Sequence, residues 1–287
     1  MNILYCGDKN IQEGLLLSVL SLCRTVQEAL HVYVLTMYCQ QGEKTYLPVT
    51  DQAIAFLDMQ VKKHDCDSFV KKLDVTDLFI ADTPEANLAT RFTAGCMLRL
   101  YADLVPELPD RVLYLDYDVI CRRDCTDFYA QDLSYPEKKR GAGQEGLEYE
   151  LAGVLDYYGR FFFRNRPLHM DYLNSGVLLL NLKEIRKTGL FEKCRTRCRE
   201  KEMFMPDQSA INKLCMRKKI CPRRFNEQRI LKDDTVLQHF TTSFRFFPWF
   251  HVLCVKPWQV DQMHEKLKLH EYDSLLDEFL QLKPQLY

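Results

Sequence analysis

Strand-like and helical runs alternate over the first part of the chain, and this alternation constrains the fold more than any other feature. NILYC (residues 2–6) and LHVYVLTMY (30–38) are apolar runs of strand length. Residues 11–26 and 51–64 follow them and carry apolar side chains at helical spacing. Parallel strands need such helical connections, so the order predicts an α/β fold with a mixed, mainly parallel central sheet flanked by helices.

The later part of the chain continues this pattern with one interruption. Residues 133–170 are rich in glycine, aromatic and charged residues, and we expect a long excursion over the site rather than a second domain. The other expected elements are a helix over 91–106 ending at Pro106, strands over 111–115 and 174–182, an amphipathic helix over 183–203, a helix over 206–215, and one or two closing helices over 260–282.

Charge and hydropathy exclude several classes of protein. The 39 Lys and Arg residues balance 40 Asp and Glu, so no overall field attracts nucleic acid. The basic stretch 216–225 is expected to be a solvated edge or, alternatively, a contact for phosphate or anionic lipid. The apolar run at the first residues is interrupted by the charged Asp8, so it lacks the core of a signal peptide. No apolar run approaches the ~18 residues of a membrane span. We therefore expect a cytoplasmic protein.

The 12 cysteines are expected to be free thiols, because they are scattered through apolar runs of a chain without an export signal. The pairs Cys121/Cys125 and Cys194/Cys198 have no second matched pair or nearby histidine. A zinc site is therefore not expected at either pair.

Two aspartates follow a strand-like run in RVLYLDYDVIC (residues 111–121). A strand repeats every two residues, so we expect Asp116 and Asp118 to project to the same side. Carboxylates this close repel each other, and a divalent cation such as Mg²⁺ or Mn²⁺ relieves that repulsion. A metal site is favoured over a plain polar turn, because ligands of open α/β sheets bind at the carboxyl ends of strands.

Other polar groups are expected near this pair. Asp8 and Asn10 follow the first strand and have the hydrogen-bonding groups to bind a base edge and a ribose. His239 follows a short apolar run late in the chain. It is either a core histidine or a ligand that completes a mixed oxygen and nitrogen shell suited to Mn²⁺.

One dinucleotide-binding pattern is rejected. GAGQEG (residues 141–146) matches G-x-G-x-x-G, but that motif works only between a strand and a helix. SYPEKKR precedes it and is not a strand.

Five blocks occur together and in order: MNILYCGDKN, MLRLYADLVPELPDRVLYLDYDV, YLNSGVLLLNL, PDQSAIN and HF followed by PW. Through these blocks, from Met1 to about Trp258, the sequence resembles the retaining nucleotide-sugar transferases of glycosyltransferase family 8, which include bacterial lipopolysaccharide galactosyl- and glucosyltransferases and glycogenin. The resemblance implies a GT-A fold, a Mn²⁺ or Mg²⁺ cofactor, a UDP-glucose or UDP-galactose donor, and hexosyl transfer to a saccharide or lipid-linked glycan acceptor.

The resemblance also implies roles for individual residues. Matched position by position, the metal ligands are Asp116, Asp118 and His239; the uridine-binding residues are Asp8 and Asn10; and the residues around the donor sugar are Arg99, Asn174, Asp207 and Gln208. Gln208 is implied to lie closest to the anomeric carbon, with Asp207 as the second catalytic candidate. An amide is a poor nucleophile, so attack from the front face, with the departing phosphate helping to deprotonate the acceptor, is favoured over a covalent intermediate.

Three positions depart from the family pattern. Ile11 stands where an aromatic residue often stacks on uracil, and Ser209 replaces an aspartate of a common Asp-Gln-Asp. The lysine that would hold the diphosphate is replaced by Arg245 or supplied by Lys256, and spacing does not choose between them.

Two rival functions share parts of this pattern. One is a haloacid-dehalogenase-type phosphohydrolase, with Asp116 as nucleophile and Asp233-Asp234 as its later acidic motif. That fold normally opens with the motif strand, whereas patterned sequence precedes Asp116 here. The other is a catalytically silent sugar-nucleotide or glycan-binding protein, against which the intact acidic pair and His239 argue.

The expected organisation is a GT-A catalytic domain over 1–249 and a helical extension over 250–287 packed on it. Aromatic and basic residues in 157–170 and 244–258 suit stacking on sugar faces or peripheral contact with the inner face of a membrane. Burial of these residues in the core is the alternative.

Overall fold

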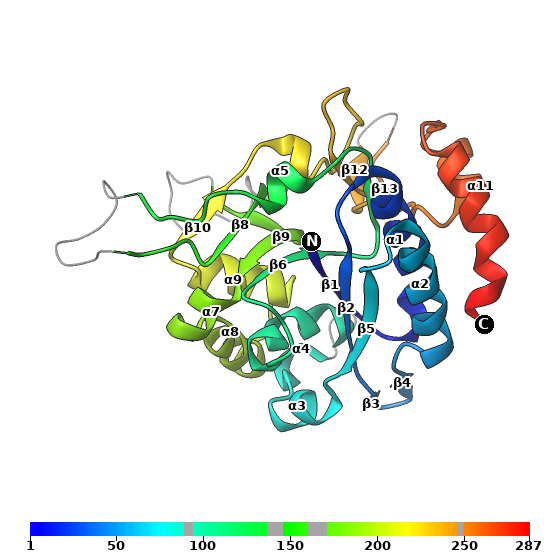
Figure 1. The fold of residues 1–287 in the computed structure, drawn as a ribbon. Helices are drawn as coiled ribbons and strands as arrows, with labels where there is room; N and C mark the ends of the chain where they lie inside the picture. Colours follow the sequence, from blue (N-terminus) through cyan, green and yellow to red (C-terminus); the bar gives the residue numbers. More distant parts are fainter. Residues whose placement is uncertain (89–93, 137–145, 160–170, 246–248) are drawn as a thin grey trace.

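A seven-stranded sheet forms the centre of the protein (Figure 1). The computed structural model describes residues 1–88, 94–136, 146–159, 171–245 and 249–287, hereafter the described residues. The strands run in the order β10-β8-β9-β6-β1-β2-β5. Their bounds are β1 Asn2–Cys6, β2 His31–Thr36, β5 Phe69–Asp74, β6 Arg111–Leu115, β8 Leu151–Leu155, β9 Leu173–Asn181 and β10 Lys218–Ile220.

The sheet is mixed and mainly parallel, as the sequence predicted. Neighbours β6, β1, β2 and β5 are parallel, and so are β8 and β10. Only β9 runs antiparallel to both of its neighbours. Because β1 pairs in parallel with β6, the carboxyl ends of these two strands lie side by side.

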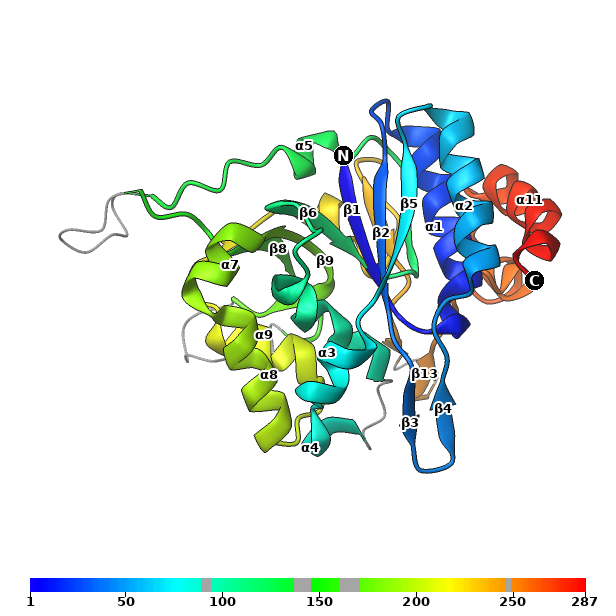
Figure 2. The ribbon, with the colours of Figure 1, turned by 60° about the horizontal axis from the view of Figure 1, so that its bottom comes forward.

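Helices cover both faces of the sheet (Figure 2). The longer helices are α1 Gln12–Thr25, α2 Asp51–His64, α7 Leu182–Thr188, α8 Leu190–Glu200, α9 Pro206–Leu214, α11 Asp273–Leu282 and the 3₁₀ helix η2 Ala94–Leu104. Shorter elements are η1 Lys9–Ile11, α3 Thr76–Ala81, α4 Glu85–Leu88, α5 Thr126–Tyr129, η4 Arg223–Phe225, α10 Val260–Glu265 and η5 Lys283–Leu286. Three two-stranded ribbons complete the described elements: β3 Cys39–Gln41 with β4 Lys44–Tyr46, β7 Val119–Cys121 with β11 Leu237–His239, and β12 Ser243–Arg245 with β13 His251–Leu253.

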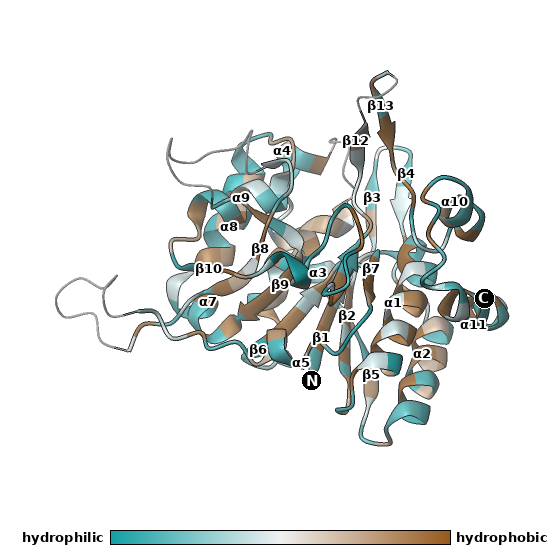
Figure 3. Cartoon of the chain, turned by 90° about the horizontal axis from the view of Figure 1, so that it is seen from above, coloured by the Kyte–Doolittle hydropathy of each residue, from teal (hydrophilic) through white to brown (hydrophobic). Residues whose placement is uncertain are grey.

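Alternating residues of the central strands enter two separate cores. Ile3 and Tyr5 of β1 pack with α1, α2 and α11, whereas Leu4 and Cys6 pack with η2, α7, α8 and α9. Successive side chains of a strand point to opposite faces, so a strand covered on both sides is apolar at every position. Figure 3 shows this as hydrophobic colour along the sheet strands.

The prediction of a single helix over 183–203 is wrong, because two helices, α7 and α8, occupy this region. Gly189 separates α7 from α8 with a φ of 63°, in the left-handed region that glycine enters without steric cost. Its N–H bonds the carbonyls of Arg186 and Ile185, which ends α7. The apolar periodicity continues across the break, so periodicity alone did not reveal it.

Two further expectations are corrected. The helix ending near Pro106 exists from Ala94, but it is a 3₁₀ helix. The excursion expected over 133–170 contains β8, a buried strand between β9 and β10, so this part belongs to the central sheet. Residues 137–145 and 160–170 lie outside the described residues, and with them most of GAGQEG and of the aromatic run 157–170.

Residues 250–287 contain β13, α10, α11 and η5. The two closing helices are thus present, and α11 packs on α1, with its Leu276 and Phe279 buried in the core that α1 also enters. Arg24 of α1 forms an ion pair of 2.7 Å with Glu278. All twelve cysteines are free, and Cys66 and Cys254 are exposed. Among the described residues, no helix has the length and apolarity to cross a membrane.

Candidate active site

The two aspartates lie just beyond the end of β6. The strand ends at Leu115, so the expectation that strand alternation sets their common direction is wrong: a turn over residues 116–118 sets it. The turn is held by a hydrogen bond from Asp116 N to Gly176 O (2.7 Å) and another from Val119 N to Asp116 O (3.1 Å). It leads directly into β7.

His239 reaches the pair through strand pairing. β7 pairs antiparallel with β11, with Val119 opposite His239. His239 Nε2 lies 3.1 Å from Asp118 Oδ1 and 3.6 Å from Asp116 Oδ2. The side chains of His239 and Asp118 are buried, and that of Asp116 is 24% exposed. His239 lies 121 positions after Asp118 and 123 after Asp116 in the chain, yet the three form one compact cluster that opens to solvent on the Asp116 side.

Gly176 of β9 makes room for this cluster. A Cβ atom at this position would lie 2.1 Å from His239 Cε1 and 2.6 Å from Asp116 Oδ2. Real Cβ contacts do not come this close, so any side chain at position 176 displaces two of the three clustered groups.

Asn174 determines which ring nitrogen of His239 carries the proton when the imidazole is neutral. Asn174 Oδ1 accepts from the backbone N–H of Gly176 (3.1 Å), which identifies this atom as the amide oxygen. His239 Nδ1 lies 3.1 Å from the same oxygen and must donate to it. In neutral His239 the lone pair of Nε2 then points at the two carboxylates.

Such a set of groups fits a divalent cation. Two carboxylates and an imidazole lone pair converge with their ligand atoms all within 4.8 Å of one another. Each group offers electrons and none offers a proton, so the arrangement is repulsive without a positive charge. The oxygen-rich, mixed set suits Mg²⁺ or Mn²⁺.

Lys256 supplies a positive charge to the same cluster. Its Nζ donates to Asp118 Oδ2 and to the carbonyl of Phe240 (3.0 Å). Burial by itself would raise the pKa of Asp118, but the adjacent positive charge of Lys256 counters burial, and that pKa lies well below its usual range. Asp118 is therefore an ionised carboxylate in the folded protein.

Arg99 of η2 anchors the other aspartate. Its guanidinium is buried and donates to Asp116 Oδ1 (2.9 Å) and to the carbonyl of Ser175 (2.5 Å). It also forms an ion pair with Asp207 (3.3 Å) and stacks on the ring of Tyr114 at 4.2 Å. The tyrosine hydroxyl donates to the same Asp116 oxygen (2.5 Å). These contacts hold Asp116 Oδ1 and leave Asp116 Oδ2 facing His239.

A buried network of amides and carboxylates adjoins the cluster. Gln208 Oε1 accepts from Ser175 N (2.9 Å) and Ser175 Oγ (3.2 Å), and Gln208 Nε2 donates to Asp156 Oδ2 (3.3 Å). Asn174 Nδ2 donates to that same Asp156 oxygen (3.0 Å). Asp207, at the first turn of α9, accepts from Ser175 Oγ (3.1 Å). Asn174 therefore connects this network to His239.

Asp156 and Ser175 were not anticipated from the sequence. Ser175 stands beside Asn174 in the quoted block YLNSG. Asp156 follows the apolar run LAGVL, which is the same strand-then-aspartate signal that marked Asp116. That signal is present in the sequence, but the glycine-rich and charged residues around it favour an excursion over a strand.

Asp8 and Asn10 lie after β1, the neighbour of β6. Asp8 is buried and accepts hydrogen bonds from both the backbone N (3.2 Å) and the side-chain Nδ2 (2.9 Å) of Asn10. Asp8 is thereby the N-cap of η1. Burial raises the pKa of Asp8. Asn10 is exposed, whereas Ile11 is buried in the core beneath Gly7 and presents no free face for stacking.

Arg245, Ser209 and the pair Asp233-Asp234 are the other positions singled out in the sequence. Arg245 ends β12, and its side chain is not among the described ones. Ser209 Oγ lies 3.1 Å from the hydroxyl of Tyr172. Asp233 and Asp234 are exposed and belong to none of the His, Cys, Asp and Glu clusters of the described residues. The residues brought together are thus Asp116, Asp118, His239, Lys256, Arg99, Asn174, Asp207 and Gln208.

Comparison with known proteins decides the family. The sequence model described as glycosyl transferase family 8 matches residues 2–261. The chain belongs to this family. Its activity is therefore the transfer of a glycosyl group, carried out on the GT-A fold.

Relatives of known description agree with this assignment. The family 8 chain is 22% identical to the lipopolysaccharide 1,2-glucosyltransferase of Escherichia coli over 305 aligned positions, which cover 94% of this chain and 83% of that protein. Among solved structures, galactosyltransferase LgtC in complex with donor and acceptor sugar analogues is similar with a TM-score of 0.64 at 18% identity, covering 99% of this chain and 95% of LgtC. The apo structure of the bifunctional glycosyltransferase WbbM gives a TM-score of 0.67 at 14% identity, and this chain spans about half of WbbM (51%).

Proposed function

We propose that this family 8 protein is a metal-dependent, retaining hexosyltransferase that moves glucose or galactose from a UDP-sugar to a saccharide or glycolipid acceptor. The observation that carries the proposal is the convergence of Asp116, Asp118 and the His239 lone pair beside the buried Gln208 network. The names of the relatives, a glucosyltransferase and a galactosyltransferase, support a hexose.

Asp116, Asp118 and His239 would hold the metal, Mn²⁺ or Mg²⁺. When bound, the ion supplies positive charge that stabilises the negative charge developing on the UDP leaving group. Arg99 and Tyr114 keep Asp116 oriented, and Asn174 keeps the His239 tautomer with Nε2 free. These supporting contacts hold the ligand atoms in place before the donor arrives.

The nucleotide would lie along the neighbouring strand ends. Asp8 and Asn10 have a carboxylate and an exposed amide at the carboxyl end of β1, suited to the base and ribose. Ile11 is buried, so uracil cannot stack on it. Recognition of the base therefore depends more on hydrogen bonds than it would with an aromatic residue at position 11. The diphosphate would lie between this end and the Asp116–Asp118 turn.

Transfer is expected to proceed on the front face of the sugar. The bond from C1 to the phosphate oxygen breaks, the acceptor oxygen bonds C1 from the same side, and the acceptor proton passes to the departing phosphate. A carboxylate nucleophile is disfavoured, because Asp207 is paired with Arg99 and Asp156 accepts four hydrogen bonds. The Gln208 amide would orient the sugar and stabilise its positive charge.

Lys256 is proposed to bind the diphosphate once the metal takes over Asp118. Lys256→Gln is then expected to raise the KM for the UDP-sugar about tenfold, because one charge-assisted contact is lost. The affinity for the metal should be unchanged or tighter. Initial rates over a range of donor and metal concentrations separate the two effects. Lys266→Gln, at an exposed lysine of the same segment, is the matched control.

Arg245 is the alternative contact for the diphosphate. If Arg245→Gln raises the donor KM while Lys256→Gln does not, the lysine serves only to neutralise Asp118. The two variants therefore assign the diphosphate contact that sequence spacing left open.

We further propose that the acceptor is a lipid-linked glycan at the inner face of a membrane, and that residues 250–287 form an extension of the catalytic domain over 1–249. Trp249, Phe250 and Val252 are exposed at the β12–β13 ribbon, in which Figure 3 colours β13 as hydrophobic. Twelve free thiols fit a reducing compartment, the cytoplasm. Exposed apolar side chains suit the headgroup region of a bilayer.

This surface contact has a direct test. Co-sedimentation with anionic lipid vesicles is expected to fall at least about threefold in Trp249→Ser/Phe250→Ser, because two exposed aromatic side chains are removed from the interface. Leu104→Ser, which removes an exposed apolar side chain of η2, is the control. Equal binding of all three proteins would contradict the membrane contact.

The function itself is tested by release of UDP from a panel of nucleotide sugars with Mn²⁺, Mg²⁺ or EDTA. Slow transfer to water makes an acceptor unnecessary. Metal-dependent UDP release from UDP-glucose or UDP-galactose supports the proposal and identifies the donor. Tight binding without turnover, or phosphatase activity, would replace it with one of the rival functions.

A further inference from the structure

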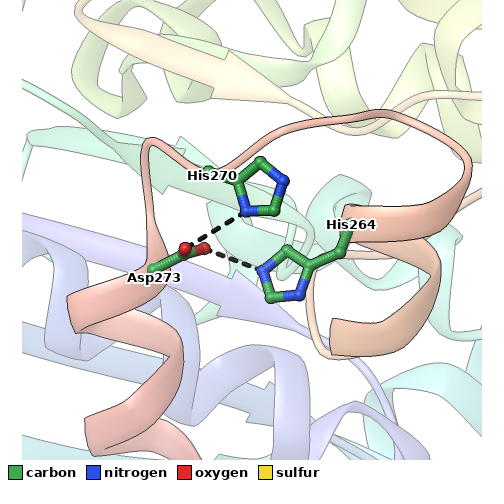
Figure 4. Close-up of side chains that lie close together, drawn as sticks. All are labelled: His264, His270 and Asp273. Atoms are coloured by element: carbon green, nitrogen blue, oxygen red, sulfur yellow. Dashed lines mark hydrogen bonds and ion pairs between the residues drawn. The ribbon is translucent and has the colours of Figure 1, made fainter.

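A second cluster of potential metal ligands lies in the C-terminal segment (Figure 4). His264 belongs to α10, His270 to the connection that follows, and Asp273 is the first residue of α11. None of the three contributes to the active-site contacts described above. They come together within ten residues of the chain, because the connection turns back on itself.

Both histidines point a ring nitrogen at the same carboxylate. His264 Nε2 lies 2.7 Å from Asp273 Oδ1, and His270 Nδ1 lies 3.2 Å from Asp273 Oδ2. The two rings are stacked, with centroids 4.6 Å apart and planes 17° apart. One potential ligand atom from each residue lies within 4.8 Å of the others.

These separations are close to those around a bound ion. With ligand bonds of about 2.0–2.2 Å, two ligand atoms of a tetrahedral ion lie about 3.3 Å apart. The observed 2.7 and 3.2 Å require only small side-chain rotations to reach that value. His270 and Asp273 are 62% and 46% exposed, so these rotations meet little resistance.

The type of ligand selects the class of ion. Two imidazoles and one carboxylate suit Zn²⁺ and its neighbours Co²⁺, Ni²⁺ and Cu²⁺, whereas Mg²⁺ and Ca²⁺ prefer oxygen ligands. Partial exposure leaves room for water at the fourth position.

The backbone holds the three residues in place. Leu267 N and Leu269 N bond the carbonyls of Gln262 and Met263, and Lys268 takes a positive φ of 53° between them. Met263 and Tyr272, which flank the cluster, are buried in the core. The ligands are therefore carried on an ordered turn rather than on a free loop.

We propose that His264, His270 and Asp273 form a second metal site, for a zinc-class transition ion, that ties α10 to α11. α11 is anchored on α1, and α10 follows Gln259, whose side chain accepts from the backbone N–H of Lys256 (2.9 Å). An ion at this site would stabilise the segment that presents Lys256 to the active site. Metal binding here is independent of the proposed sugar transfer, so its test does not use activity.

The test compares Zn²⁺ binding to the full-length protein and to His264→Gln/His270→Gln by equilibrium dialysis. The double variant is expected to bind one ion fewer per chain, or to bind that ion at least about 100-fold more weakly, because two of three protein ligands are lost. Zn²⁺ is expected to raise the Tm of the wild type by more than that of the variant. With Cu²⁺, the electron paramagnetic resonance spectrum should lose the nitrogen couplings of two imidazoles.

Two controls exclude other sites. His251→Gln removes an exposed histidine of β13, and Cys66→Ser removes the thiol of the exposed Asp65-Cys66-Asp67 cluster. Each control variant should bind the ion that the double variant loses, with the affinity of the wild type. If the double variant fails to fold, His270→Gln alone serves, since this side chain is largely exposed. Unchanged Zn²⁺ stoichiometry and affinity in the folded variant, or an equal loss in His251→Gln, would overturn the proposal.

Discussion

Asp118→Asn is expected to reduce metal-dependent release of UDP by at least about 10³-fold. Asp118 is the buried, ionised member of the proposed metal-binding cluster, and it contacts both His239 and Lys256. An amide removes one full negative charge from the ligand set, and electrostatic stabilisation of a leaving group by a metal accounts for several kcal/mol, where each 1.36 kcal/mol is tenfold in rate. The measurement is the initial rate of UDP release with saturating Mn²⁺.

Asp234→Asn is the matched control for this prediction. Asp234 is an exposed aspartate outside the cluster, and it belongs to the pair that would act in a phosphohydrolase. Its variant should keep the full transfer rate, and circular dichroism of Asp118→Asn should match the wild type. Full activity of Asp118→Asn in the folded protein would remove Asp118 from the metal site.

Gly176→Ala is expected to abolish Mn²⁺ binding at the active site and to reduce turnover at least about 100-fold. The new methyl group would overlap His239 Cε1 at 2.1 Å and Asp116 Oδ2 at 2.6 Å, so both groups must move. Ligand positions must hold within about 0.5 Å for a site to work. Overpacking in a buried strand also costs about 1–3 kcal/mol of folding stability, which denaturant unfolding measures.

Gly153→Ala separates these two effects. Gly153 lies in β8, next to β9, and a Cβ there would meet Leu178 Cδ2 at 2.8 Å, the end of a flexible side chain. This variant is expected to lose stability while the folded protein keeps its metal affinity and rate. If Gly153→Ala loses as much metal affinity as Gly176→Ala, general loosening of the sheet explains the effect, and Gly176 has no special role at the site.

Large parts of the fold were predictable from local patterns. Strands β1, β2, β6 and β9 and helices α1, α2 and α9 appear where apolar spacing and start signals indicated them, because these elements bury a continuous face. The errors have local causes. Gly189 breaks a helix whose apolar period continues through it, and β8 lies among glycine-rich and charged residues that are typical of a loop.

The candidate site was predictable in its residue types and less so in its contacts. Asp116 and Asp118 stand out because carboxylates follow a buried strand, and they do lie together, but a turn rather than strand alternation orients them. His239 could not be joined to them by local reasoning, since their contact depends on the pairing of β7 with β11. Whether Lys256 reaches the cluster also depended on a chain path that spacing does not specify.

The sequence by itself determined the alternation of strands and helices, the acidic pair at a strand end and the ordered blocks of a family 8 transferase. These properties depend on neighbouring residues, whose spacing fixes which face of an element is apolar. Only the tertiary structure decided that Asn174 turns the His239 lone pair toward the aspartates, that Gly176 leaves them room, and that Asp156 joins Gln208. Each of these contacts joins residues far apart in the chain, and packing of the whole sheet is what brings them within a few ångströms.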